Sequence, residues 1–263
     1  MKAHRPLLRT RKRVNAFVTA LRGVPHGRYV SILGVLFGLV ALRSFVGARD
    51  LGTWLLENLP VALGVLFLWT TYRRMPLSRM SYSLIFLFWT LHEIGAHWTY
   101  AKVPYDDSWR SLFGVTFNSH FGFSRNHFDR VVHFSYGLLI AYPLREFFLR
   151  VASVRGFWGY FLPFDVTVST SAFYELLEWG TAAVVGSDAS NDFLGSQGDF
   201  WDSQKDMALA SLGALIAMTS TALITWHYKR DFAREFGESL RIKKAAPFGE
   251  DAIAQIQLDP RGR

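Results

Sequence analysis

The stretch "DMALASLGALIAMTSTALITWHY" (residues 206–228) carries its one charged side chain at the first position and is apolar for most of its length. A helix rises 1.5 Å per residue and needs about 20 residues to cross the hydrocarbon layer of a bilayer. Five earlier stretches meet the same requirement, at residues 29–48, 54–72, 80–100, 129–149 and 157–184. The sequence therefore predicts an all-α fold, a polytopic membrane helical bundle of about six transmembrane helices.

The composition agrees with a membrane protein. The chain is 50% hydrophobic and 19% charged, whereas soluble domains carry about 25% charged residues. The absence of cysteine excludes a disulfide framework, a thiolate metal site and a cysteine nucleophile. The formal charge is +8, but the basic residues cluster at the ends of apolar runs, as in helices anchored on the cytoplasmic side. We therefore expect no nucleic-acid partner.

The charges of the loops predict the orientation. The loops at residues 72–80 and 150–156 contain three and two arginines and no acid, whereas residues 187–206 contain five aspartates and one lysine. The positive-inside rule places the arginine-rich loops and both termini in the cytoplasm, and residues 187–205 outside. The expected location is the plasma (inner) membrane, with several passes.

Three regions follow from this topology. Residues 1–28 hold eight basic residues and no acid and form a basic cytoplasmic arm. Residues 29–228 form the membrane domain. Residues 229–263 form a cytoplasmic tail of mixed charge, which we expect to be solvated and largely disordered.

Histidines and carboxylates gather in the predicted outer half of four spans. Many are spaced three or four residues apart and so share a helix face: Glu93 and His97, Asp129 and His133, Glu175 and Glu178, and Asp202 and Asp206. Such side chains cost roughly 2.5–3.5 kcal/mol each in a membrane and usually mark a site. We expect a single cavity lined by His97, Asp129, His133, Glu175, Glu178, Asp202 and Asp206.

This cluster has more acids than bases, so protons or cations must balance it. Arg125, Arg130 and Lys205 are cations within the sequence, and we expect the two arginines to pair with carboxylates or lipid phosphates at the headgroup level. A divalent metal is the alternative, since imidazole nitrogen with carboxylate oxygen suits zinc, manganese or iron. A structural or proton-linked network without metal explains the same pattern.

Candidate roles follow from these residue types. The candidate metal ligands are His97, Asp129, His133, Glu175, Asp202 and Asp206. The candidate catalytic residues are Glu93, Glu178 and Asp199. No glycine loop of the phosphate-binding kind occurs, so no organic cofactor is expected.

Other polar or small residues in the spans suit a structural role. Arg43, Glu57, Arg145 and Asp165 are assigned to helix packing or to snorkelling towards an interface. Gly34 and Gly38 have the GxxxG spacing of a close helix contact.

Four ordered motifs carry a family resemblance: "GAHWTYAKVPYDD" (95–107), "RNHFDRVVHFSYG" (125–137), "SAFYELLEW" (171–179) and "LGSQGDFWDSQKDMALASLGAL" (194–215). Over residues 54–227 the chain resembles the YjdF-like inner membrane proteins, a bacterial family of unknown function. More distantly, its motifs are similar to those of VanZ-like membrane proteins. The resemblance implies the membrane class and the polar site, and it names no reaction.

Three functions fit the sequence. The first is a metal-dependent hydrolase or transferase that acts on a lipid-linked substrate at the outer face of the membrane. The second is a cation- or proton-linked transporter or binding protein. The third is a structural membrane protein without catalysis. In each case the lipid bilayer is the immediate partner.

Overall fold

The protein is described by a computed structural model that covers residues 23–185, 197–243 and 249. Within these ranges all regular secondary structure is helical. The long helices are α2 (His26–Phe45), α3 (Leu51–Thr71), α4 (Arg79–Trp98), α7 (Phe128–Val151), α8 (Trp158–Val185) and α10 (Asp202–Tyr228). Each overlaps one of the six expected stretches, which confirms the all-α bundle.

The surface of the bundle is that of a membrane protein. Helices α2, α3 and α10 are long and apolar enough to cross a membrane. Leucines on several of the long helices, such as Leu39, Leu63 and Leu176, are exposed. A surface covered by large apolar side chains suits contact with hydrocarbon.

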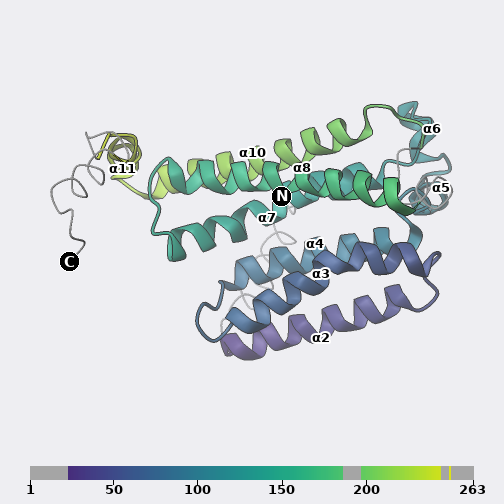
Figure 1. The fold of residues 1–263 in the computed structure, drawn as a ribbon, viewed down its shortest axis with the longest axis horizontal. Coiled ribbons are helices and arrows are strands. Elements are labelled where there is room, and N and C mark those ends of the chain that lie inside the picture. Colours follow the sequence, from purple (N-terminus) through teal and green to yellow (C-terminus); the bar gives the residue numbers. More distant parts are fainter. Residues whose placement is uncertain (1–22, 186–196, 244–248, 250–263) are drawn as a thin grey trace, which may run out of the picture.

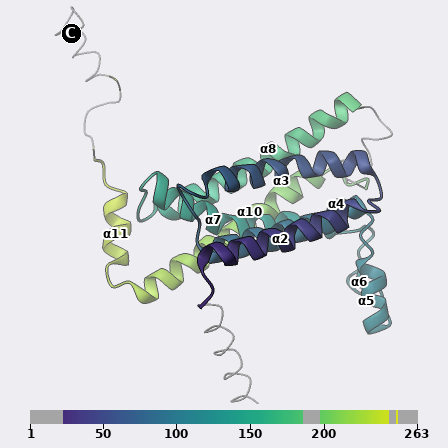
Figure 2. The same ribbon diagram turned by 90° about the horizontal axis from the view of Figure 1, so that it is seen from below.

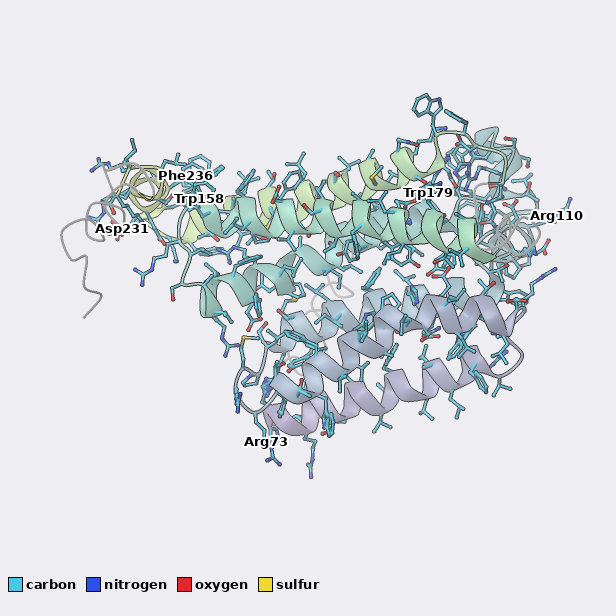
Figure 3. The ribbon with its side chains drawn as sticks, viewed as in Figure 1. Arg73, Arg110, Trp158, Trp179, Asp231 and Phe236 are labelled. Atoms are coloured by element: carbon cyan, nitrogen blue, oxygen red, sulfur yellow. The ribbon has the colours of Figure 1, made fainter. Side chains whose placement is uncertain are left out.

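The long helices form two groups that lie side by side, α2 to α4 and α7, α8 and α10 (Figure 1). The first group joins the second chiefly through α4, which packs against α7. Short helices α5 (Tyr105–Phe113) and α6 (Phe117–Phe121) lie at one end of the bundle, and they project away from it to one side (Figure 2). Arg110 and Trp179 lie towards this end, whereas Arg73 and Asp231 lie towards the opposite end (Figure 3).

Helices α7 and α10 approach each other through glycine. A Cβ atom at Gly137 would overlap the backbone carbonyl of Ala210, and one at Gly213 would overlap the backbone of α7. Only glycine permits so close a contact. Gly34 and Gly38 behave differently, because a Cβ at either would meet nothing within 4 Å. The expected GxxxG contact of α2 is therefore not made within the described chain.

Part of the tail is ordered. Helix α11 (Phe232–Ser239) packs on the start of α8: the indole Nε1 of Trp158 donates a 3.0 Å hydrogen bond to the carbonyl of Ser239, and the rings of Phe157 and Phe236 lie 5.6 Å apart. The expectation of a disordered tail is wrong for these residues, because aromatic side chains on one face of α11 find partners on α8. Residues 1–22 of the basic arm and most of the chain after residue 243 lie outside the described residues.

Candidate functional site

Three helices of the second group converge on the imidazole of His133. Its Nε2 lies 3.5 Å from Oδ1 of Asp129, one turn earlier on α7, and 3.4 Å from Oε1 of Glu175 on α8. Asp206 of α10 completes the group, since one ligand atom each from Asp129, His133 and Asp206 lie within 4.8 Å of one another. The expectation that Asp129 and His133 point inward together with acidic residues of the last two spans is confirmed.

The glycine contact explains why these side chains meet. His133 lies four residues before Gly137 on α7, and Asp206 lies four residues before Ala210 on α10. The two helices run in the same direction and touch at Gly137 and Ala210. One turn further towards the α5 and α6 end, the same close approach brings His133 and Asp206 together.

These groups are buried and incompletely satisfied. The exposed fractions are 9% for His133, 7% for Glu175 and 2% for Asp206. Oε1 of Glu175 and Oδ1 of Asp206 have no hydrogen-bond donor among the described residues. A buried acceptor without a partner costs about 1–3 kcal/mol, and more when it is charged, so a proton or a cation must balance these oxygens.

The donor set fits a divalent metal. Nitrogen and oxygen ligands bind zinc at about 2.0–2.2 Å in a tetrahedral arrangement, which places the ligand atoms about 3.3–3.6 Å apart. The ligand atoms of Asp129, His133 and Asp206 all lie within 4.8 Å of one another, and they would have to approach one another further to hold one ion together. Glu175, beside His133, is available as a fourth ligand.

A second set of acidic residues, near the end of the bundle that carries α5 and α6, is paired with cations. Arg125 donates to both carboxylate oxygens of Asp202, and Arg130 donates to Asp199 at 2.5 Å and to Asp202 at 3.2 Å. The Lys205 ammonium, 2.6 Å from Asp199, holds the pKa of that carboxyl well below its usual range. The expected pairing of both arginines with carboxylates is confirmed, and Asp199 and Asp202 are engaged in ion pairs.

Two candidates on α4 lie elsewhere. Nδ1–H of His97 donates a 2.7 Å hydrogen bond to the carbonyl of Ser44 on α2. The Glu93 carboxylate is buried near Ser44, Trp54 and Asn58 of α2 and α3. The expectation that His97 joins the cavity is wrong, because this face of α4 packs against the first two helices.

The histidine of α4 that lines the cavity between the two helix groups is His92. Its Nε2–H donates to the carbonyl of Glu57 at 3.1 Å, and its Nδ1 accepts from the hydroxyl of Tyr100 at 2.6 Å. Tyr174 of α8 donates to the carboxylate of Glu57 at 2.6 Å. Sequence reasoning assigned Glu57 to packing and missed the other three residues.

A left-handed turn places Tyr100. Thr99 and Tyr100 have φ angles of 54° and 46°, a region that side chains other than glycine rarely adopt. The turn folds the Tyr100 ring back over Gly95, where a Cβ would overlap the ring. The order "GAHWTY" (95–100) is thus a local signal for this arrangement.

A cavity of about 670 Å³ connects these features. Its polar end is formed by His92, Tyr100, Asp129, His133, Tyr174 and Glu178. The remaining lining is almost entirely apolar and comes from α3, α4, α7 and α8. Of the residues expected to line one cavity, Asp129, His133 and Glu178 do so directly, and Glu175 and Asp206 contact or approach His133 from beside it.

Comparisons with known proteins agree with the membrane class. The profile of a family described as predicted membrane protein (DUF2238) matches residues 29–227. The chain is 40% identical over 200 residues to the inner membrane protein YjdF of Escherichia coli (strain K12), across 76% of this chain and 90% of that protein. No solved structure gives a significant match. The more distant likeness to VanZ-like proteins is not shown by these comparisons.

Proposed function

We propose, since the chain belongs to the DUF2238 family of predicted membrane proteins, that it is a metal-dependent hydrolase or transferase acting on a lipid-linked substrate. Asp129, His133 and Asp206 would hold a divalent metal, with Glu175 beside them. The polar end of the substrate would lie in the cavity next to this cluster.

One observation carries the proposal. A histidine and carboxylates from α7, α8 and α10 meet around His133, and Asp206 and Glu175 keep buried oxygens that no described donor satisfies. Ion pairs elsewhere already occupy Asp199 and Asp202. Both oxygens of Glu93 also lack a donor among the described residues, but no other ionisable ligand of the described chain meets them there, whereas Glu175 and Asp206 lie beside His133 and Asp129. A network held together only by packing leaves these oxygens unexplained.

The cavity places a candidate base and hydrogen-bonding groups next to the candidate metal ligands. A bound divalent metal lowers the pKa of water or polarises a substrate oxygen. Glu178 lines the cavity at the same end as Asp129 and His133, where its carboxylate can accept a proton from a nucleophile. Tyr100 and Tyr174 line the same end; because their hydroxyl protons are donated to His92 and Glu57, their oxygens are left to accept hydrogen bonds from the polar part of a substrate.

The proposal includes a topology. All six long helices cross the membrane, both termini are cytoplasmic, and the cluster lies in the outer half. The arginine-rich loops at residues 72–80 and 150–156 lie at the end opposite α5 and α6 (Figure 1), which supports this orientation through the positive-inside rule. The substrate would then be presented from the outer leaflet.

The test is the metal content of the purified, membrane-extracted protein, measured by elemental analysis. We expect about one equivalent of zinc, manganese or iron in the parent protein, since three or four protein ligands define one site. Asp206→Asn and His133→Ala should each lose the metal. His97→Gln, which alters a histidine on the other face of α4, is the matched control and should keep it. Absence of metal from the parent would favour a network without metal, and retention of metal in His133→Ala would show that the metal binds at another site.

A further inference from the structure

We infer that the cavity holds the hydrocarbon chain of a polyprenyl lipid, which reaches it sideways from the bilayer between α3 and α8. The position of the headgroup, beside Asp129 and His133, rests on the proposed function. The position and length of the chain rest on the shape and lining of the cavity alone.

The length of the cavity is measured along α7. One continuous stripe of this helix lines it: Asp129, Val132, Tyr136, Ile140, Leu144 and Phe147. Asp129 and Phe147 are eighteen residues apart, which corresponds to about 27 Å along a helix. At the deep end the lining includes Met75 and Leu77, in the loop before α4.

This length selects among lipid chains. A phospholipid acyl chain reaches about half the hydrocarbon thickness, roughly 15 Å. The cavity continues well beyond that depth, so an acyl chain would leave its lower part unfilled. A long polyprenyl chain can occupy the whole length, and burying each additional methylene-sized group contributes about 0.8 kcal/mol.

The opening of the cavity faces the lipid. Leu59, Leu63 and Phe67 on α3 and Phe173 and Leu177 on α8 line the cavity and are also exposed; Leu63 is 59% and Phe173 60% exposed. Residues that are both lining and exposed mark the edges of an opening. Because α3 packs mainly on α4, a chain can pass between α3 and α8 without leaving an apolar environment.

The polar end fixes the direction in which the chain lies. Asp129, His133 and Glu178 occur at one end only, and the hydrogen bond from Tyr174 to Glu57 joins α8 to α3 at that end. The opposite end of the cavity is apolar, so a hydrocarbon chain can fill it without burying a polar group. A headgroup at that end would be buried without hydrogen-bond partners. The headgroup therefore lies beside the ionisable cluster.

The test uses photoreactive lipids and the full-length protein in phospholipid nanodiscs. One probe is a long polyprenyl phosphate, and the other is a lysophospholipid with one saturated acyl chain. Leu144→Trp fills the deep half of the cavity, and Leu215→Trp, at an exposed position on α10, is the matched control. Metal content is measured on the same samples.

We expect the polyprenyl probe to label the parent and Leu215→Trp more strongly than the acyl probe does. Labelling of Leu144→Trp should fall by about tenfold or more, the loss that corresponds to two methylenes kept out of an apolar site. Equal labelling by both probes, or labelling unchanged in Leu144→Trp, would overturn the inference. Selective labelling of a metal-free parent would support the chain site and reject the metal, so the two proposals fail separately.

Discussion

The hydroxyl of Tyr174 on α8 donates a 2.6 Å hydrogen bond to the buried carboxylate of Glu57 on α3. It joins the two helices that border the opening of the cavity. Tyr174→Phe should lower stability by about 1–3 kcal/mol, because it leaves a buried acceptor without its donor. Thermal unfolding in one detergent measures this change.

The control for this substitution is Tyr136→Phe. Tyr136 also lines the cavity, but its hydroxyl pairs with the neutral hydroxyl of Thr170 at 2.6 Å. Loss of this hydrogen bond should lower the free energy of unfolding by about 0.5–1.5 kcal/mol. Equal losses of stability in the two variants would show that the hydrogen bond to Glu57 contributes no more than the one to Thr170.

Gly137 should tolerate no side chain. Gly137→Ala places a methyl group against the backbone of Ala210, and overpacking of this kind costs about 1–3 kcal/mol or more. It should also separate His133 from Asp206 and reduce bound metal. Gly38→Ala is the control: its Cβ meets nothing, and alanine is favoured over glycine in a helix by about 0.5–1 kcal/mol. A stable, metal-loaded Gly137→Ala protein would contradict the close contact.

Asp202 should matter more to stability than Asp199. Both carboxylates pair with Arg125 and Arg130, but the side chain of Asp202 is 6% exposed and that of Asp199 is 18% exposed. Removing one partner of a buried ion pair costs about 3–5 kcal/mol because the other charge remains buried. Asp202→Asn should therefore unfold at a clearly lower temperature than Asp199→Asn, and the reverse order would show that Asp199 is the principal partner.

Asp50 predicts a pH dependence outside the spans. Its Oδ1 accepts a 2.6 Å hydrogen bond from the backbone N–H of Thr53 at the start of α3, which lowers the pKa of Asp50. A carboxyl group whose pKa is lower in the folded state stabilises the protein at pH values above its unfolded-state pKa of about 3.9. This contribution is lost as the pH falls through and below that pKa.

Unfolding of Asp50→Ala and Asp50→Asn beside the parent measures this contribution. At neutral pH, Asp50→Ala should lose about 1 kcal/mol of capping energy, and Asp50→Asn should lose less because its amide oxygen still accepts. The advantage of the parent over Asp50→Asn should shrink as the pH is lowered from 6 towards about 3. An advantage that stays constant over this range would exclude the ionised carboxylate as its source.

The topology is tested with reporter fusions. Fusions in the loops at residues 72–80 and 150–156 should report a cytoplasmic location, and fusions between α5 and α6 should report the outer side. Replacing the arginines of the 72–80 loop by glutamine provides a control, because it should weaken the orientation signal without changing helix length. An external location for residues 150–156 would reverse the proposed arrangement.

The long helices and the pair of Asp129 and His133 could be predicted from the sequence, because hydropathy fixes where a helix lies and a spacing of four places two residues on one face. The partner of that face could not be predicted. On α4, His92, Glu93 and His97 are all buried or partly buried, yet only His92 reaches the cavity. Periodicity gave no means to decide which side of α4 meets α7 and which meets α2.

Glu57 shows a second limit. One carboxylate in an apolar helix has the same pattern whether it serves packing or a site, and its partner Tyr174 is 117 residues away in the chain.

The glycine contacts show a third limit of prediction from the sequence. Gly34 and Gly38 have the spacing of a close contact and make none, whereas Gly137 and Gly213 lie on separate helices and each meets the backbone of the other helix. Such contacts depend on the arrangement of whole helices.

The two helix groups differ in length. Helices α2, α3 and α4 have 20 or 21 residues, about 30 Å, which equals the thickness of a bilayer core. Helices α7, α8 and α10 have 24, 28 and 27 residues, about 36–42 Å. Both groups can match one bilayer only if the longer helices tilt or extend beyond it. With the proposed topology of six spans, we expect hydrophobic mismatch to act on the angle between the groups, so that a change in bilayer thickness widens or narrows the inferred passage between α3 and α8.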